Sequence, residues 1–393
     1  MNVLFVSHDA GRNGAPMVLL HLQRWLNKFS DLKFGTLFRN SGVLVDSFSS
    51  VSEFIITPPL VISKPPSIAS RIWRRIFKFP AITETSHYLW LDNAKNISYQ
   101  VIYSNTVTNG DVVERLKKPG VRIITHVHEL DYWIAESGEK NWNLVKEQTD
   151  KFIVCSHAVA NALVQRHGIC KEKIEVVHEF VSSDIQEFTN DEILSVRKSL
   201  MIPSDAFLVV ASGAELLRKG KDLLVPLAKA CYDLEGVGRP FYLMWVGNPG
   251  NDESRYWFLH DARKLGLEDR IKWVGETSEP HRYFASSDAF AMISREDPFP
   301  LVCLEAALYR KPIVCFDDAG GIPELVENDA GFIVPYLDLT EMAKRLLELR
   351  DNIELASAMG AAAAEKVKAF YSVNIIAPKI HEIIQRELNL AKV

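Results

Sequence analysis

The sequence predicts an α/β protein with two doubly wound parallel-sheet domains. Short apolar runs of strand length alternate with longer amphipathic segments, and this alternation occurs twice along the chain. The length of 393 residues also suits two cores better than one. Hydrophobic residues make up 47% of the chain and charged residues 24%, a globular composition that excludes intrinsic disorder.

The expected strands are apolar runs rich in β-branched and aromatic residues, as in strands covered on both faces. They are 3–6, 34–38, 53–57, 100–105, 122–127, 151–156 and 174–180 in the first half, and 207–213, 241–247, 271–275, 289–294, 312–316 and 331–335 in the second. Helix candidates between them include 15–29, 112–117, 158–167, 223–232 and 301–310. Alternation of this kind predicts βαβ units and hence parallel sheets.

We expect an N-terminal domain over 1–182 and a C-terminal domain over 192–372, joined by a polar stretch. A cleft between the domains is expected at the carboxyl ends of both sheets, where doubly wound folds bind ligands. The last helices, 353–370 and 373–390, either cap the second domain or cross back onto the first, and we assign that crossing to 373–393.

Charge and cysteine usage exclude several classes of protein. The formal net charge of −5 argues against a nucleic-acid partner. No apolar run is long enough to span a bilayer, and the apolar start at 3–6 is too short for a signal peptide. The five cysteines are scattered with no CxxC pair, which favours reduced thiols and a cytoplasmic location.

The most informative segment is 293–309, ISREDPFPLVCLEAALY, in which a strand ends and a helix begins near Leu301. Pro300 suits the first helical turn, where its missing N–H costs nothing. The free N–H groups at Leu301 and Val302 would form an anion site for a diphosphate. Glu305, one turn further in, is placed to accept hydrogen bonds from two adjacent ribose hydroxyls.

Asp297 in the preceding loop and Glu305 are separated by seven residues, and this segment resembles the acidic E-x7-E motif of the retaining GT-B glycosyltransferases of glycosyltransferase family 4. The stretch 311–338 is similar to that family's strand, Gly-Gly-x-Pro-Glu loop and next strand, in the same order. The resemblance covers most of 205–340, and 1–180 more loosely. Paired acids at this spacing also occur by chance, so the ordered set of motifs matters more than the pair.

The resemblance implies a GT-B fold, with two Rossmann-like domains facing across a cleft. It also implies transfer of a sugar from a nucleoside-diphosphate sugar to a hydroxyl with retained configuration, the leaving phosphate taking the acceptor proton. We therefore expect a retaining hexosyltransferase of bacterial surface polysaccharide or lipid-linked glycan synthesis. Its partners would be the donor and a glycan or lipid-linked acceptor, with no metal and no other cofactor.

Two loops of the C-terminal half are similar to donor-binding elements of the family. Lys219, followed by glycine, resembles the lysine that neutralises the donor diphosphate, whose negative charge grows as the glycosidic bond breaks. The family's arginine after the preceding strand is missing, and Arg218 is the candidate replacement; a basic surface loop is the alternative. Gly320 and Gly321 would let the backbone approach the donor, or else form an ordinary turn. The following Glu324 is expected to cap the following helix or contact the donor.

The N-terminal half offers weaker candidates. Gly14 and Ala15 lie in a strand-to-helix turn that lines the donor and acceptor region in the resembled family, and this turn is not the G-x-G-x-x-G of dinucleotide-binding proteins. Asn105, Thr106 and Thr108 follow another strand and either cap the next helix or contact the acceptor.

His128 is the candidate catalytic histidine, because His128-Glu129 resembles the family's His-acidic pair, whose histidine hydrogen-bonds the donor sugar. A metal site at His126-x-His128 is the less favoured alternative, since no third ligand is spaced nearby. A histidine that lies in the cleft without a chemical role is the other alternative.

The first acid of the E-x7-E motif departs from the family pattern. The family usually has glutamate where this chain has Asp297, the expected third catalytic residue beside His128 and Lys219. Glu296 would substitute for it if the loop register slipped by one residue. The shorter side chain puts the identity of the sugar in question more than the reaction.

Basic residues alternate with aromatic ones in 64–80, KPPSIASRIWRRIFKFP. Such a helix suits a membrane surface, so we expect peripheral contact through 68–80 at the inner face of the membrane; a helix packed on its own domain is the alternative.

Two rival functions remain on this fold: a sugar-nucleotide epimerase and a non-catalytic nucleotide-sugar-binding scaffold.

Overall fold

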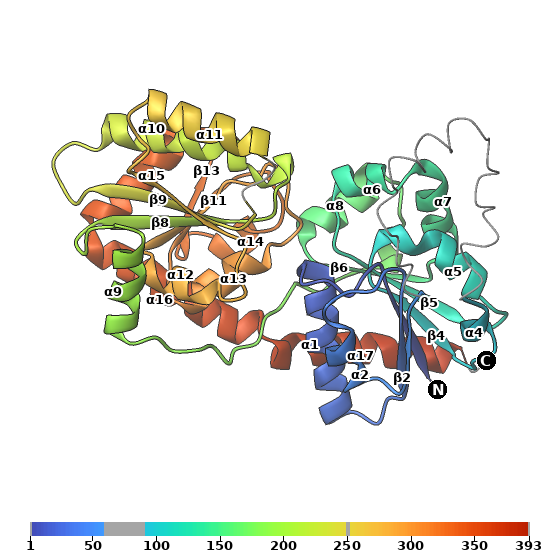
Figure 1. The fold of residues 1–393 in the computed structure, drawn as a ribbon. Helices are drawn as coiled ribbons and strands as arrows, with labels where there is room; N and C mark the ends of the chain where they lie inside the picture. The colour runs from blue at the N-terminus through green and yellow to red at the C-terminus, as the bar shows by residue number, and fades with distance from the viewer. Residues whose placement is uncertain (1, 59–90, 249–251, 392–393) are drawn as a thin grey trace, which may run out of the picture. The chain divides into compact units, whose positions relative to one another are not determined.

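The computed structural model describes residues 2–58, 91–248 and 252–391 and is organised around two parallel β-sheets (Figure 1). Every apolar run expected to be a strand holds one. The basic and aromatic segment 64–80 lies outside the described residues, so the expected membrane-surface helix stays a prediction. Within the described part of the chain, no helix is both long and apolar enough to cross a membrane.

The first sheet consists of β1 (Val3–Ser7), β2 (Phe34–Phe38), β3 (Ile55–Ile56), β4 (Val101–Ser104), β5 (Arg122–Val127), β6 (Lys151–Val154) and β7 (Ile174–Val176). Its strand order is β3-β2-β1-β4-β5-β6-β7. The accompanying helices are α1 (Gly14–Phe29), α2 (Val45–Ser49), α4 (Asp92–Lys95), α5 (Gly110–Leu116), α6 (Asp131–Glu136), α7 (Glu139–Gln148) and α8 (His157–Gln165), with the 3-10 turns η2 (Val107–Asn109) and η3 (Lys171–Lys173).

The second sheet consists of β8 (Phe207–Ser212), β9 (Phe241–Val246), β10 (Ile271–Gly275), β11 (Ala289–Met292), β12 (Ile313–Phe316) and β13 (Gly331–Val334), in the order β10-β9-β8-β11-β12-β13. Its helices are α9 (Asn190–Ser199), α10 (Leu224–Leu234), α11 (Asp252–Lys264), α12 (His281–Ser286), α13 (Leu301–Leu308), α14 (Pro323–Val326), α15 (Leu339–Asp351), α16 (Ile353–Phe370) and α17 (Val373–Leu390), with the 3-10 turns η4 (Leu217–Lys219) and η5 (Lys221–Leu223). Figure 1 shows α10 and α11 on one face of this sheet and α12 and α13 on the other.

The strand orders confirm the predicted doubly wound architecture. In both sheets the first strand lies at the centre, between the second and the fourth, and it pairs with each of them in parallel. The winding direction therefore reverses between β1 and β4 in the first sheet, and between β8 and β11 in the second. Doubly wound sheets bind ligands at the carboxyl ends of the two strands that flank such a reversal.

Residue contacts divide the chain into two compact units. Unit 1 groups the described residues of Met1–Val127, Ile134–Phe152 and His381–Val393, and unit 2 groups those of His128–Trp133 and Ile153–Ile380. The last turns of α17 thus belong to unit 1, where Glu387 forms a 2.8 Å ion pair with Arg122.

The core of unit 2 forms where the second sheet packs against α10 and α15. Strand residues such as Phe207, Trp245 and Phe316 are fully or almost fully buried there, together with Leu227 of α10 and Leu346 of α15. Burial on both faces explains why the strands read as continuous apolar runs rather than as alternating ones.

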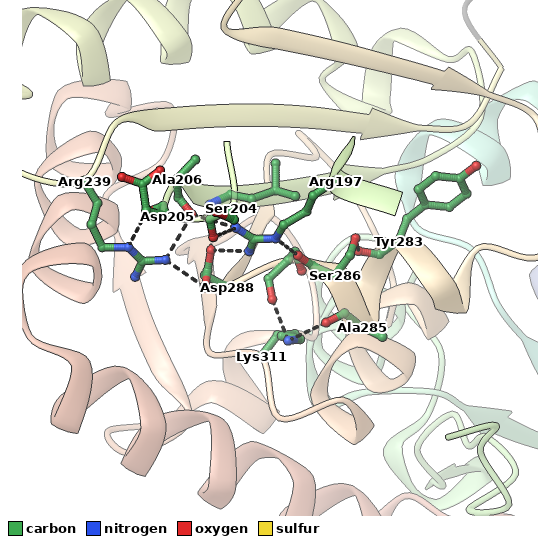
Figure 2. Close-up of polar contacts among 12 residues, drawn as sticks. Arg197, Ser204, Asp205, Ala206, Arg239, Tyr283, Ala285, Ser286, Asp288 and Lys311 are labelled. Atoms are coloured by element: carbon green, nitrogen blue, oxygen red, sulfur yellow. Dashed lines mark hydrogen bonds and ion pairs between the residues drawn. The ribbon is translucent and has the colours of Figure 1, made fainter. Parts of the chain in front are cut away.

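A buried arginine joins α9 to the strand that leads into the site described below (Figure 2). Arg197 donates to the carbonyls of Ser286 and Ala206 at 2.9 and 2.8 Å, and to the carboxylate of Asp288 at 2.8 Å. The same carboxylate oxygen accepts the N–H of Leu208 at 2.7 Å. Asp288 immediately precedes β11, so this network fixes the start of that strand against β8.

Lys311 completes the network with donations to the carbonyls of Ala285 and Ser287 at 3.0 and 2.5 Å (Figure 2). Its burial lowers the pKa of Lys311 to about 8; the carboxylate of Asp288 opposes this shift and the charge of Arg197 adds to it. The cations here thus act as donors to carbonyls at the ends of helices and strands.

We predict that Arg197→Met lowers the free energy of unfolding by about 3 kcal/mol or more, because it removes the principal cation from Asp288 and the donor from buried carbonyls. Urea unfolding measures this loss. The matched control is Arg263→Met, since Arg263 is 74% exposed and paired with Glu268 on the surface; it should cost at most about 1 kcal/mol. Equal losses in the two variants would contradict the prediction.

Candidate functional site

Two loops of unit 2 meet at the carboxyl ends of β8 and β11, where the second sheet reverses its winding. The first loop contains η4 and leads into α10; the second leads into α13. The backbone N–H of Arg295 donates to the carbonyl of Arg218 at 2.7 Å, and the guanidinium of Arg218 donates to the carbonyl of Glu296 at 3.0 Å. The two loops therefore hold each other in place.

Glycine is required at position 220 by the close approach of these loops. Gly220 has a left-handed φ of +73°, and a Cβ there would collide with the carbonyl oxygen of Ile293, at the end of β11. The turn between Lys219 and α10 can thus lie directly on the strand end only without a side chain. This packing is a physical reason for the Lys-Gly pair seen in the sequence.

The centre of the site is an ion pair between the ammonium of Lys219 and the carboxylate of Asp297. The side chains are 15% and 9% exposed, and Arg218 lies 3.9 Å from the same carboxylate oxygen. Two cations thus surround one anion, which leaves a net positive charge for an anionic ligand. The Nε of Arg218 is buried and has no hydrogen-bond partner in the described part of the chain.

The loop that contains Asp297 also contacts the loop of Gly320 and Gly321, the two glycines that the sequence analysis assigned to the donor site. The N–H of Asp297 donates to the carbonyl of Ala319 at 2.8 Å, and the N–H of Gly321 donates to that of Pro298 at 3.0 Å. Gly320 has a φ of +132°, and a Cβ there would collide with the carbonyl oxygen of Asp297. In this structure the Gly-Gly loop packs against the acidic loop.

Helix α13 begins at Leu301, as expected, but Pro300 is its N-cap and not a residue of its first turn. The side chain of Pro300 makes no capping hydrogen bond at this helix start, where Leu301 and Val302 are half-buried. Glu305, one turn further in, is 26% exposed and lies 3.8 Å from the imidazole of His281. Burial raises the pKa of the Cys303 thiol well above its usual range; the charges of Asp297 and Glu305 add to this shift, and that of Lys219 opposes it. These three side chains therefore lie around the first turns of α13.

Glu296 does not take the place of Asp297, because its carboxylate accepts the N–H of Tyr132 at 3.3 Å. The neighbouring Arg295 pairs with Asp222 at 2.6 Å. Of the acids in this loop, Asp297 is the one that contacts Lys219.

His128 pairs with a residue that the sequence did not point to. Its Nδ1 forms a short hydrogen bond with the carboxylate of Glu179, and both side chains are only 6% exposed. The carboxylate of Glu129 accepts the backbone N–H of His128 at 2.9 Å. A histidine-glutamate pair formed by residues 51 positions apart has no local sequence signal.

A group of carboxylates around Cys155 connects this pair with the Asp297 loop. Burial raises the pKa of the Cys155 thiol well above its usual range, and the charges of Glu179, Glu129, Asp297 and Glu324 add to this shift. Unit 2 therefore holds the candidate residues His128, Arg218, Lys219, Asp297, Leu301, Val302, Glu305, Gly320 and Gly321.

Glu324 caps α8 rather than the helix that follows it in sequence. Its carboxylate accepts the N–H groups of His157 and Ala158, both at 3.1 Å, and a 2.7 Å hydrogen bond from His178. Burial would raise the pKa of Glu324, but the bonds from His178 and from the two N–H groups outweigh it and lower the pKa.

One group of three residues among those described could hold a metal ion, since ligand atoms of His157, His178 and Glu324 lie within 4.8 Å of one another. The capping hydrogen bonds of Glu324 already account for this group without an ion. His126 is the other member of the His-x-His pair, and its Nδ1 shares a 2.7 Å hydrogen bond with the hydroxyl of Tyr103.

The remaining candidates lie in unit 1. Gly14 and Ala15 begin α1, and a Cβ at Gly14 would meet no atom within 4 Å, so packing does not require glycine there. Asn105 donates to the carbonyl of Ala15 at 2.8 Å and so anchors α1 instead of capping the next helix. Thr106 accepts the N–H of Thr108 at 3.2 Å and caps η2.

Two family models match most of the chain. Residues 193–366 match the model described as glycosyl transferases group 1, and residues 45–184 match that of glycosyltransferase family 4. Among curated proteins, the chain is 26% identical over 264 residues to N-acetyl-alpha-D-glucosaminyl L-malate synthase of Bacillus anthracis, which covers 65% of this chain and 66% of that protein. It is 29% identical over 278 residues to a GDP-mannose-dependent phosphatidylinositol monomannoside mannosyltransferase of Corynebacterium glutamicum. This match covers 67% of this chain and 69% of that protein.

For three of the curated relatives, the matched stretches span between half and two thirds of the relative's own length. Similar solved structures include HepE of Anabaena in complex with UDP-glucose, with a TM-score of 0.77 and 19% identity over 98% of this chain and 100% of that one. Sucrose-phosphate synthase from Thermosynechococcus elongatus gives a TM-score of 0.74 with 16% identity, over 98% of this chain and 99% of that one. These likenesses confirm the expected fold with two Rossmann-like parallel sheets.

We predict that Gly220→Ala destabilises the protein more than Gly266→Ala. Both glycines have a left-handed φ, but a Cβ at Gly266 would meet no atom within 4 Å. Gly266→Ala should therefore cost only the backbone term of about 1–2 kcal/mol, whereas Gly220→Ala adds a collision worth a further ~1–3 kcal/mol. Urea unfolding of both variants gives the difference, and equal losses would show that the contact with Ile293 is not tight.

Proposed function

Because this chain belongs to the group 1 glycosyl transferases of glycosyltransferase family 4, we propose that it moves a sugar from a nucleoside-diphosphate sugar to an acceptor hydroxyl with retention of configuration. The observation that best supports this proposal is the ion pair of Lys219 with Asp297 at the start of α13, with Arg218 beside it. A cluster with excess positive charge at a helix start suits a diphosphate.

Lys219 and Arg218 would bind the diphosphate together with the N–H groups of Leu301 and Val302. The leaving diphosphate gains negative charge as the glycosidic bond breaks, so cations fixed beforehand stabilise the transition state more than the ground state. These two cations also neutralise charge in the way that a divalent ion does in other transferases. We therefore propose no metal requirement and no other cofactor.

Glu305 and Asp297 would bind the two sugars of the donor. Glu305 is half-buried one turn into α13 and is proposed to accept the ribose hydroxyls. Asp297 would contact the transferred sugar while it shares Lys219 with the diphosphate. His128 would hydrogen-bond the same sugar, and the leaving phosphate would take the acceptor proton, so no separate general base is needed.

We propose a UDP-sugar as the first donor to test, since HepE of Anabaena was solved with UDP-glucose; a GDP-sugar is second, after the GDP-mannose-dependent relative. A bacterial surface glycan or lipid-linked acceptor fits relatives such as a lipopolysaccharide core glycosyltransferase of Rhizobium meliloti. A cytoplasmic enzyme that works on such an acceptor would meet the membrane surface, and segment 68–80 is our proposed contact.

We predict that Lys219→Met weakens UDP binding about ten- to hundredfold, because it removes a charge-assisted hydrogen bond to phosphate. Isothermal titration calorimetry with UDP and GDP measures this change. Lys229→Met is the control, since Lys229 on α10 is 40% exposed and pairs with Asp233. Lys219→Met also leaves the carboxylate of Asp297 without this cation, which can destabilise the fold. The double variant Lys219→Met/Asp297→Asn removes both charges, so it checks that the affinity is not lost through unfolding.

Glu305→Gln should weaken the binding of UDP and leave the binding of inorganic diphosphate, which has no ribose, unchanged. The control is Glu365→Gln, at a side chain that is 76% exposed, and it should change neither affinity. Product analysis then separates the alternatives. Sugar transfer to an acceptor supports the proposal, net conversion of the donor without acceptor indicates an epimerase, and binding without turnover indicates a scaffold. If every site variant still binds the nucleotide as wild type does, the proposed location of the donor is refuted.

A further inference from the structure

The side chain that pairs with His128 comes from two strands away. His128 follows β5 and Glu179 follows β7, and β6 lies between these strands in the sheet order. The two side chains meet beyond the end of β6, where the small residue Cys155 stands directly after the strand. The pairing is thus a product of the sheet topology.

The environment of this pair favours opposite charges on its two members. Glu179 is buried, with 6% of its side chain exposed, and its Oε2 has no hydrogen-bond partner among the described residues. A buried carboxylate with so few donors is costly unless a cation compensates it. The imidazole of His128 is the group in contact, and a protonated ring would supply that cation.

One other charged group acts in the same direction, since the carboxylate of Glu129 accepts the backbone N–H of His128. Burial alone would lower the pKa of His128, but the charge and hydrogen bond of Glu179, with the charge of Glu129, raise it above the ordinary value of histidine. The ring therefore stays protonated to a higher pH than a solvent-exposed histidine does.

We propose that Glu179 is a positioning residue of the donor site: it accepts the Nδ1 proton of His128, fixes the orientation of the ring, and keeps the ring an imidazolium. This inference rests on the proposed function, in which His128 binds the transferred sugar. With Nδ1 held by Glu179, any hydrogen bond from the ring to the donor has to come from Nε2, and that atom carries a proton in the imidazolium. The ring then acts as a charged hydrogen-bond donor to an oxygen of the sugar and holds the sugar in place.

The direct test is an NMR titration of the His128 ring in the full-length protein, with its signal assigned by His128→Gln. We expect the wild-type ring to titrate above the ordinary histidine pKa of about 6.5, and Glu179→Gln to move that pKa down, because the substituted amide can still accept a hydrogen bond but has no charge. Glu179→Asp keeps the charge and should keep most of the shift. Glu187→Gln is the control, since Glu187 is exposed and lies eight residues further along the chain.

The same variants should differ in how turnover depends on pH. In Glu179→Gln the fraction of imidazolium falls at lower pH than in wild type, so the alkaline limb of kcat moves to lower pH. Near pH 8 we expect a loss of roughly tenfold or more, and this loss should shrink as the pH falls toward the lowered pKa of His128 in the variant. A merely structural role would lower kcat equally at every pH.

A wild-type ring that titrates at or below the ordinary value overturns the proposal, and this holds even if Glu179→Gln fails to fold. An unchanged pKa in folded Glu179→Gln overturns it as well. If the titration behaves as expected but wild type transfers no sugar from any donor, the proposed function fails while the coupling of Glu179 to His128 stands, so the two failures can be told apart.

Discussion

The architecture of the site depends on one contact, the ion pair of Lys219 with Asp297. Each partner lies on a loop that follows a central strand of the second sheet, and these strands flank the point where the winding reverses. A partly buried ion pair is weak evidence for stability, because desolvation offsets its Coulomb energy. Its value here is geometric: it fixes two loops that come from distant parts of the sequence, and with Arg218 it leaves positive charge beside a helix start.

The glycines of the site are explained by this contact as much as by any ligand. Gly220 lets the lysine loop lie on the end of β11, and Gly320 lets its loop lie on the backbone of Asp297. Both would collide with a carbonyl oxygen if they had a Cβ. Glycine in these loops is therefore needed to build the charged cluster before any donor arrives, and close approach of the protein backbone to the donor would be a second use of the same shape.

The sequence was sufficient for the fold and for the position of the loop between β11 and α13, because both depend on local pattern. The run 53–57 gave only the two-residue strand Ile55–Ile56, which lies at the edge of the first sheet among the described residues. The helix expected over 301–310 ends at Leu308, and Arg310 follows with a left-handed φ of +59° that an α-helix cannot include. The partners of His128 and Glu324 were not predictable, because Glu179 and the start of α8 reach them only through the order of strands.

Charge balance connects the two halves of the proposed mechanism. Four carboxylates, those of Glu129, Glu179, Asp297 and Glu324, surround the buried Cys155, whose thiol stays neutral because its pKa is raised. So many acids close together would repel an anionic donor unless cations outweigh them locally. Lys219 and Arg218 do so at Asp297, and hydrogen bonds from His178 and from two helix N–H groups offset the charge of Glu324. A protonated His128 is the counterpart at Glu179, and without it this side of the site would present an uncompensated negative charge to the sugar and its diphosphate.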